Sequence, residues 1–229
     1  MNSDVKYQTK SLILSSIIIS LGMFFSAYYF KNNPNSNETV KGVSELKVKS
    51  NLSTWQLSIS NSGSNLNSLY ANLEQNQKFI KSFLINNNFT ESEFNLGTIS
   101  ISNSNDNNQL KYQIYNSITI TTKDVDKVNK VSSNLKPLID NNVLISGSYI
   151  NYYYTDISSI KNELLDLSIN NSKISAKLMA DKINKKVGNV KSLNQGVITI
   201  NSLDGSQIND TNSIYKNVRM VSTVIYELK

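Results

Sequence analysis

The chain has 229 residues, 39% of them hydrophobic, with 23 Lys and Arg against 17 Asp and Glu, a formal net charge of +6, and neither Cys nor His. The missing residue types exclude disulfides, thiolate metal sites and thiol nucleophiles, and also Ser-His-Asp catalysis and zinc hydrolysis of the HExxH type. The hydrophobic share is enough for one large domain or two small ones with a packed core.

An uncharged apolar run, LILSSIIISLGMFFSAYYF, occupies residues 12–30. At ~1.5 Å per residue, a helix over this run spans about 28 Å, close to the ~30 Å hydrocarbon thickness of a bilayer. A cleavable signal peptide needs small residues at positions −3 and −1, whereas cleavage after Ala27 or Ser26 leaves Phe25 or Phe24 at −3. The sequence therefore predicts an uncleaved, single transmembrane helix at 12–30.

The residues that flank this run predict its orientation. Lys6 and Lys10 precede it, and the positive-inside rule places residues 1–11 in the cytoplasm as an N-terminal tail. Residues 31–39 are polar and contain a proline, so we expect a linker, and residues 40–229 then form an extracytoplasmic domain. The prediction is a single-pass protein of the inner (cytoplasmic) membrane, with its C-terminal domain in the periplasm or otherwise outside the cytoplasm.

Two strands and a helix are expected first in the C-terminal domain. Residues 40–50 have partial strand character, and residues 52–61 alternate apolar and polar side chains more clearly. Ser62–Gly63–Ser64 breaks this alternation. Apolar residues at 3,4 spacing then predict a helix that ends near Ile85.

A hairpin, a second helix and a further strand follow. Strands are expected at 94–102 and 110–121, and the polar segment SNSNDNNQ between them is the expected hairpin loop. A second helix starts at Thr122–Asp124 with its valines and leucines inward, and Pro137 should disturb its last turn. The strand expected at 143–154 ends in three tyrosines.

A long helix is the main feature of the C-terminal third. Asp156 can cap it, it runs to about Val187, and Gly188 fits its C-terminal cap. Two final strands are expected at 189–201 and 212–229, separated by the turn LDGS.

This long helix has two apolar stripes, although a helix lying on one sheet needs only one. The first stripe comprises Leu165, Ile169, Ala176, Met179, Ala180, Ile183 and Val187. The second comprises Ile160, Leu164, Leu167, Ile174 and Leu178. Since exposed apolar stripes are usually interfaces, one interpretation makes the second stripe an oligomer contact. The alternative is a helix sandwiched within its own chain, or one interrupted at Asn170–Asn171.

The order of elements is ββαββαβαββ, and residues 52–154 give βαββαβ, a ferredoxin-like split βαβ unit. Because hairpin strands adjoin in the sequence, an α+β fold fits better than a doubly wound α/β fold. The predicted fold class is α+β with one long C-terminal helix, preceded by a single transmembrane helix.

Three segments resemble the SIMPL-domain family, a bacterial domain of unknown function found in YggE-like periplasmic and envelope proteins. Val40–Leu57, VKGVSELKVKSNLSTWQL, resembles the opening strand of the family with its G-x-(G/S)-E pattern. Tyr112–Tyr154 resembles its Tyr-rich strand, helix start and aromatic cluster. Residues 176–193, AKLMADKINKKVGNVKSL, resemble its helix-to-strand junction. The long helix of the family is usually alanine-rich, and here only Ala176 and Ala180 fit.

The resemblance covers residues 40–229 and implies a non-enzymatic envelope protein. It also implies homo-oligomeric assembly and a link to oxidative or envelope stress. The family has no established catalytic motif, so the resemblance assigns no site residue.

Other candidate sites have plainer explanations. Asp124 and Asp126 could bind a cation or act as paired acids, but negative charge at a helix start is favoured by the helix dipole. Glu163 and Asp166 are more typical of a solvated helix edge. We predict no catalytic residue, no metal site, no cofactor and no identified small-molecule substrate.

The polar and aromatic clusters are also expected to be structural. Asn103–Asn108 contains one acid among amides, too few carboxylates for a calcium loop, so a plain turn is expected. Tyr149–Tyr154 could stack a ligand, but alternation directs Tyr152 and Tyr154 one way and the other tyrosines the opposite way. One set should be core, as should Trp55.

The segment AKLMADKINKKVGNV places four lysines in a short stretch: Lys177, Lys182, Lys185 and Lys186. The predicted topology outside the cytoplasm argues against nucleic acid as a partner, and lysines late in a helix favour its negative end. A role at an anionic membrane surface is kept only as a minor possibility.

The functional prediction is a membrane-anchored envelope protein that is not an enzyme and self-associates through residues 40–229. Its partners would be other copies of itself and, through residues 12–30, the membrane. One alternative is a periplasmic binding adaptor for another envelope protein. A second is a carboxylate-based cell-wall hydrolase, which needs two acids ~5–9.5 Å apart in one cleft.

Overall fold

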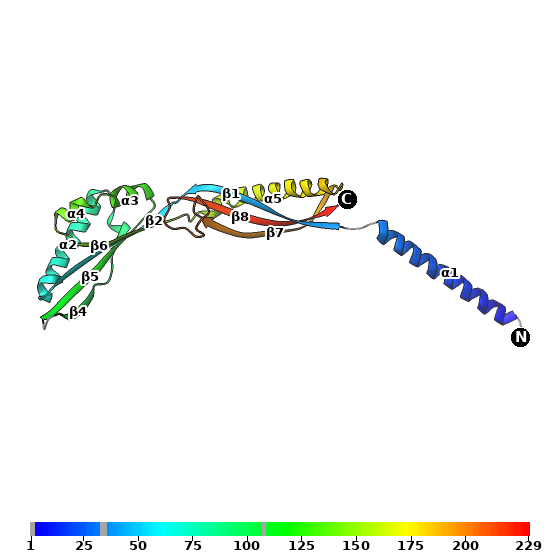
Figure 1. The fold of residues 1–229 in the computed structure, drawn as a ribbon, viewed down its shortest axis with the longest axis horizontal. Helices are drawn as coiled ribbons and strands as arrows, with labels where there is room; N and C mark the ends of the chain where they lie inside the picture. The colour runs from blue at the N-terminus through cyan, green and yellow to red at the C-terminus, as the bar shows by residue number, and fades with distance from the viewer. Residues whose placement is uncertain (1–2, 33–35, 107–108) are drawn as a thin grey trace. The chain divides into compact units, whose positions relative to one another are not determined.

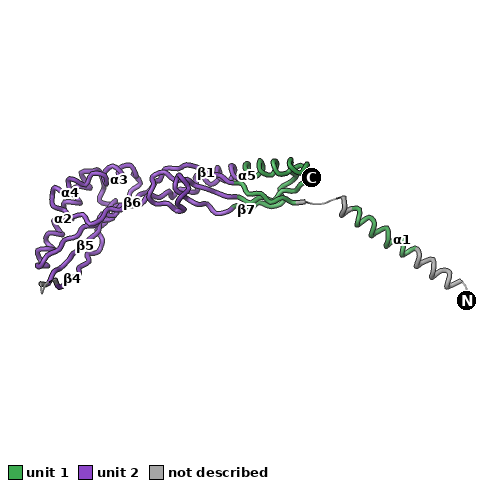
Figure 2. Tube along the Cα trace, in the orientation of Figure 1, with its two compact units in different colours: residues 1–42, 169–195, 222–229 green, residues 43–168, 196–221 purple. Residues whose placement is uncertain are grey.

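The computed structural model describes residues 3–32, 36–106 and 109–229, and the chain is α+β as predicted (Figure 1). It divides into two compact units (Figure 2). Unit 1 comprises residues 1–42, 169–195 and 222–229, and unit 2 comprises residues 43–168 and 196–221.

The structure contradicts the predicted transmembrane helix at residues 12–30. α1 (Ser3–Asn32) is helical through this run, but no helix in the described part of the chain is long and apolar enough to cross a membrane. Side chains of α1 are described for residues 14–28. The ends of the predicted run, residues 12–13 and 29–30, lie outside the described side chains. The predicted transmembrane anchor and the single-pass inner-membrane placement are corrected accordingly.

One sheet of unit 2 contains the predicted βαββαβ element. Its strands are β2 (Leu52–Gly63), β3 (Phe94–Leu96), β4 (Ser100–Asp106), β5 (Gln109–Thr122) and β6 (Ile145–Tyr153). The order is β3-β5-β2-β6, with β4 also paired to β5, and every described pairing is antiparallel. This is a split βαβ arrangement, in which β2 takes the central place that its fully buried Trp55, Leu57 and Ile59 require.

The helices of this part are α2 (Leu66–Asn86), the 3-10 turn η1 (Glu91–Glu93), α3 (Val125–Ser132) and α4 (Lys136–Asp140). The predicted second helix is two helices because Pro137 lacks an N–H and so cannot continue α3, whereas it is tolerated in the first turn of α4. The predicted strand 94–102 is likewise split. β3 ends at Leu96 and β4 begins at Ser100, and between them the Gly97 N–H still donates to the Ser117 carbonyl oxygen of β5 at 2.7 Å.

Three helices end on an asparagine with positive φ: Asn88 after α2, Asn142 after α4 and Asn184 after α5 (Ile157–Lys182). Each forms a Schellman motif. In α5, the N–H of Lys185 donates to Ala180 and the N–H of Asn184 to Asp181. The predicted cap at Gly188 is therefore wrong, because asparagine supplies the left-handed residue earlier and the helix ends at Lys182.

The second sheet is three-stranded, in the order β1-β8-β7, with bounds β1 (Ser36–Lys49), β7 (Val187–Asn201) and β8 (Tyr215–Leu228). Residues of β1, β8 and α5 form a core in each unit. In unit 1, Val40, Ala176, Val224 and Tyr226 pack together. In unit 2, Leu164, Val218 and Met220 do so, with Leu46, Ile160 and Ile198 against them.

Candidate functional site

Within unit 1, small side chains form the buried face of α5. Ser172, Ala176 and Ala180 follow one another at four-residue spacing and are all fully buried. The hydroxyl groups of Ser172 and Tyr226 lie 2.9 Å apart, within hydrogen-bond distance. Since these side chains are short, this half of α5 can approach β8 closely without using its large apolar residues.

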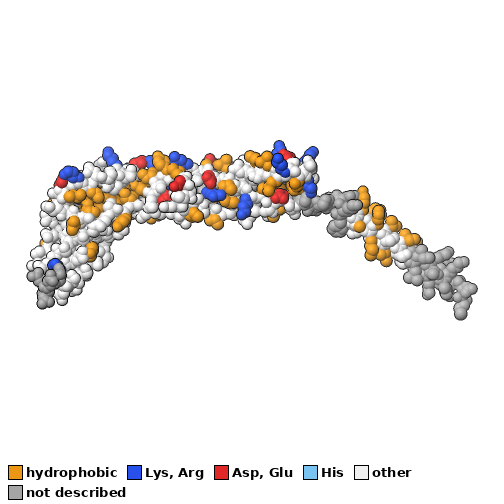
Figure 3. Space-filling view, viewed as in Figure 1, with side chains coloured by type: hydrophobic (Ala, Val, Ile, Leu, Met, Phe, Trp, Pro, Cys, Tyr) orange, Lys and Arg blue, Asp and Glu red, His pale blue; other side chains and the backbone are white. Residues whose placement is uncertain are grey.

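The large apolar residues of this part of α5 face outward instead. The exposed fractions are 59% for Ile174, 61% for Leu178, 47% for Met179 and 56% for Ile183. Figure 3 shows hydrophobic side chains gathered with lysines over this end of α5. We call Ile174 and Leu178, which lie on the side of the helix away from Ser172 and Ala176, the α5 outer surface. Exposed apolar patches of this kind are typical of contact sites.

The residues of the predicted oligomer contact do not share one environment. Leu164 is fully buried against Val218 and Met220 of β8, and Ile160 is half-buried against the same core. Leu167, Ile174 and Leu178 are 39%, 59% and 61% exposed. Only these last three are therefore available to another molecule. The first stripe is mixed in the same way, because Met179 and Ile183 are exposed.

β7 adds an unpaired strand edge to unit 1. The sheet order places β7 at the edge beside β8, and no strand of the described chain pairs with its other side. Residues 189–195 are all exposed, including Val190 at 53% and Leu193 at 45%. An edge strand presents free N–H and C=O groups that can pair with another strand.

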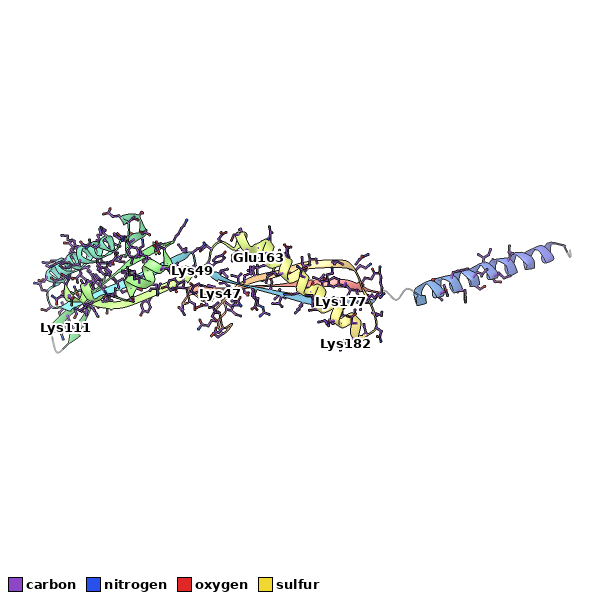
Figure 4. The ribbon with its side chains drawn as sticks, turned by 90° about the horizontal axis from the view of Figure 1, so that it is seen from above. Lys47, Lys49, Lys111, Glu163, Lys177 and Lys182 are labelled. Carbon is purple, nitrogen blue, oxygen red and sulfur yellow. The ribbon has the colours of Figure 1, made fainter. Side chains whose placement is uncertain are left out.

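Positive charge surrounds the α5 outer surface. Lys173, Lys177, Lys182 and Lys186 are exposed, and Figure 4 shows Lys177 and Lys182 on α5. Opposite charge is sparse nearby: Asp181 lies on the same helix, and Glu227 pairs with Lys191 at 3.7 Å. This part of unit 1 is therefore both apolar and basic.

The acidic pairs have structural positions. Asp124 caps α3 by accepting the Lys127 N–H at 3.0 Å, and Asp126 forms an ion pair with Lys49 at the end of β1. Glu163 and Asp166 are exposed on α5. These placements match the structural interpretations of all four carboxylates.

The residues of the aromatic and amide clusters also have structural positions. Trp55 is fully buried and donates to the Ser148 hydroxyl at 2.9 Å, as expected of a core residue. Tyr152 is buried while Tyr149 is 66% exposed. The loop expected at 103–108 is shorter than predicted, because β4 extends to Asp106 and β5 begins at Gln109; residues 107 and 108 lie outside the described residues.

Sequence reasoning missed a buried ion pair in the connection between β7 and β8. The side chains of Lys216 and Asp210 are each 1% exposed, and the Nζ and Oδ2 atoms lie 3.5 Å apart. The ammonium also donates to the Asp210 carbonyl oxygen at 2.7 Å. Burial lowers the pKa of Lys216, and Asp210 partly opposes this effect. Alternation along β8 could have revealed Lys216, since it is in phase with the buried Val218, Met220 and Val224.

The carboxylates of this connection are held ionised. Burial would raise the pKa of Asp210, but N–H groups of Asn212 and Ser213 and the charge of Lys216 together lower it. The Ser202 hydroxyl, with the N–H and hydroxyl of Ser206, lowers the pKa of Asp204 to about 2. Both acids line a pocket of about 480 Å³. A glycosidase needs a carboxylic acid with a raised pKa, so this pair is unsuited to that role.

Among the residues that the structure covers, no group of three or more acidic residues is placed to hold a metal ion. No curated protein matches the chain. The family model that matches residues 39–222 is SIMPL, described as "Protein of unknown function (DUF541)". The match extends over most of the chain, from β1 into β8, and agrees with the resemblance seen in the sequence. The chain belongs to the SIMPL family.

Proposed function

We propose that this protein is a non-enzymatic scaffold that self-associates through the α5 outer surface and the β7 edge of unit 1. The observation that carries the proposal is that α5 buries small side chains in unit 1 and exposes large apolar ones. Its buried face in unit 1 is made of Ser172, Ala176 and Ala180, while Ile174 and Leu178 lie outside. Burying a large apolar side chain contributes about 1.5–3 kcal/mol, and this contribution is available only to a contact partner.

A second copy of the chain can satisfy both features together. An isologous contact brings identical surfaces together, so the apolar residues of α5 meet apolar residues. β7 can extend the sheet by antiparallel pairing with β7 of the second copy, since main-chain groups need no complementary sequence.

The basic charge distinguishes this proposal from the adaptor alternative. Two copies that meet at α5 bring Lys177 and Lys182 of each close together, and this repulsion is screened by salt. Self-association should therefore strengthen as the salt concentration rises. A partner recruited by these lysines would be acidic, and its binding should weaken with salt.

Sedimentation equilibrium of the full chain tests the proposal at about 50 mM and about 500 mM NaCl. We expect reversible oligomers that increase with protein concentration and increase further at high salt. A strict monomer at both salt concentrations, up to high micromolar protein, would remove the self-association proposal. An assembly that dissociates at high salt would instead show that charge pairing, and not the α5 outer surface, holds the copies together.

A further inference from the structure

An uncharged groove in unit 2, far in the sequence from α5, has a separate chemistry. It lies between α2, the end of β2 and the connection from α4 to β6, and Figure 1 shows α4 beside α2. Its volume is about 460 Å³, within the range of ~300–1,000 Å³ typical of small-molecule sites. Its lining comprises Asn61, Ser62, Leu69, Asn72, Gln75, Asn76, Phe79, Asn141, Asn142 and Leu144.

Amide side chains dominate this lining, and none of the described lining residues carries a charge. Each amide offers two N–H donors and a carbonyl acceptor. Asn72 and Gln75 are exposed on α2, and Asn61 is half-buried at the end of β2. The groove can therefore donate and accept hydrogen bonds along its length, and it provides no cation for a phosphate or carboxylate.

Asn76 marks the groove as more than a polar surface. It is only 7% exposed, yet no described residue forms a hydrogen bond with its side-chain amide. The next residue, Gln77, does find a partner and donates to the Asn116 carbonyl oxygen at 3.2 Å. The fully buried side-chain atoms that lack a partner in the described chain are those of Ser50 and Asn201, so the Asn76 amide, which has no partner among the described residues, is open to water at the groove. A ligand that hydrogen-bonds to Asn76 would take the place of that water.

Apolar side chains form the rest of the lining. Phe79 follows Asn76 by three residues on α2 and is half-buried, Leu69 is buried, and Leu144 is 59% exposed. Amides beside an aromatic ring and aliphatic groups suit a ligand that has C–H faces as well as many neutral hydrogen-bonding groups.

We propose that this groove binds a neutral oligosaccharide. Sugar hydroxyls both donate and accept, as the amides of Asn72, Asn76 and Asn61 do, and the C–H face of a sugar ring can pack on Phe79. A short uncharged peptide also carries donors and acceptors, but its amides are fixed along one line. The sugar, with hydroxyls around each ring, matches amides that converge from three elements.

Titration of the full chain followed by NMR, with 15N labelling to observe the side-chain amides, tests the proposal. The probes are maltotriose, triacetylchitotriose, the acidic sugar trigalacturonate, and uncharged tetra-alanine with blocked ends. Asn76→Ala and Asn72→Ala alter the groove. Asn67→Ala is the matched control, because Asn67 is exposed on the same helix outside the groove. Thermal unfolding of each variant checks that it is folded.

We expect saturable shifts with at least one neutral sugar at millimolar concentration, and about tenfold weaker binding in Asn76→Ala, the loss of roughly 1.4 kcal/mol. Asn72→Ala should weaken binding without changing the unfolding temperature, and Asn67→Ala should bind normally. No saturable shift with either neutral sugar, a preference for trigalacturonate or the peptide, or equal weakening in Asn67→Ala would each overturn the proposal. Because Asn72 is exposed, its variant tests the groove even where Asn76→Ala unfolds.

Discussion

Replacing Ile174 and Leu178 with glutamine should separate association from folding. Both side chains are about 60% exposed, at 59% and 61%, so a contact that covers them gains about 0.6 of the ~1.5–3 kcal/mol of a fully buried side chain. The two together contribute about 2–4 kcal/mol for each surface that enters the contact. Both copies in an isologous contact carry the substitutions, so the loss is about 4–8 kcal/mol, and at 1.4 kcal/mol per factor of ten Ile174→Gln with Leu178→Gln should raise the dissociation constant by about 700-fold or more.

The same double variant should leave the monomer intact. Glutamine is a good helix former, and exposed substitutions usually change stability by about 0.5 kcal/mol or less. Urea unfolding of dilute protein checks the monomer, and sedimentation velocity over a concentration series measures association.

Ile139→Gln is the matched control, since Ile139 is also 61% exposed but lies on α4. It should associate like the unaltered chain. Equal weakening in Ile139→Gln, or unchanged association in the double variant, would refute the assignment of the contact to α5. A fall in monomer stability of more than ~1 kcal/mol in the double variant would show that these side chains support the fold instead.

Three further predictions concern the fold. Lys216→Met should cost about 3–5 kcal/mol in urea unfolding, because Asp210 then lies buried without its partner; the double variant with Asp210→Asn should recover part of this loss, and no recovery would contradict the pairing. The pKa of Asp204 is about 2, below its ordinary value of 3.8, so its stabilisation is complete above pH ~4 and is lost as the pH falls towards ~2. The unfolding temperature should therefore fall less over this range in Asp204→Asn, and parallel curves would refute the shift. Asn88→Ala should cost about 1 kcal/mol while Asn88→Gly is nearly neutral, because φ is positive there; equal stabilities would contradict this account.

Periodicity in the sequence is enough to predict most of the fold, because the elements concerned are amphipathic on a single sheet. The alternation of Trp55, Leu57 and Ile59 correctly indicated a strand with one buried face. The stripe of α2 likewise predicted a helix whose end lies within about one residue of Asn86. At Pro137 the sequence predicted that the helix would be disturbed, but it did not predict that a second helix would begin there.

The candidate surface was harder to predict because a helical wheel does not say which stripe faces the sheet. On α5 the buried positions in unit 1 are occupied by serine and alanine, which carry almost no hydrophobic signal, and Leu164 of the second stripe is core. The groove residue Asn76 was hidden for a similar reason, since an amide at an inward position of α2 looks like any other polar residue in an asparagine-rich chain. The span at 12–30 was assigned from hydropathy, and the structure did not support it.

The open side of β7 determines what kind of assembly this chain can build. If β7 of one copy pairs with β7 of another, the contact covers the β7 edge of both copies, and growth through β7 stops at a closed pair. If β7 instead meets the β1 edge of another copy, every addition leaves a new free edge, and the product is a ring only where the rotation closes. With Lys191 as the only charged residue along residues 187–195 of β7, little else opposes the growth of an open filament.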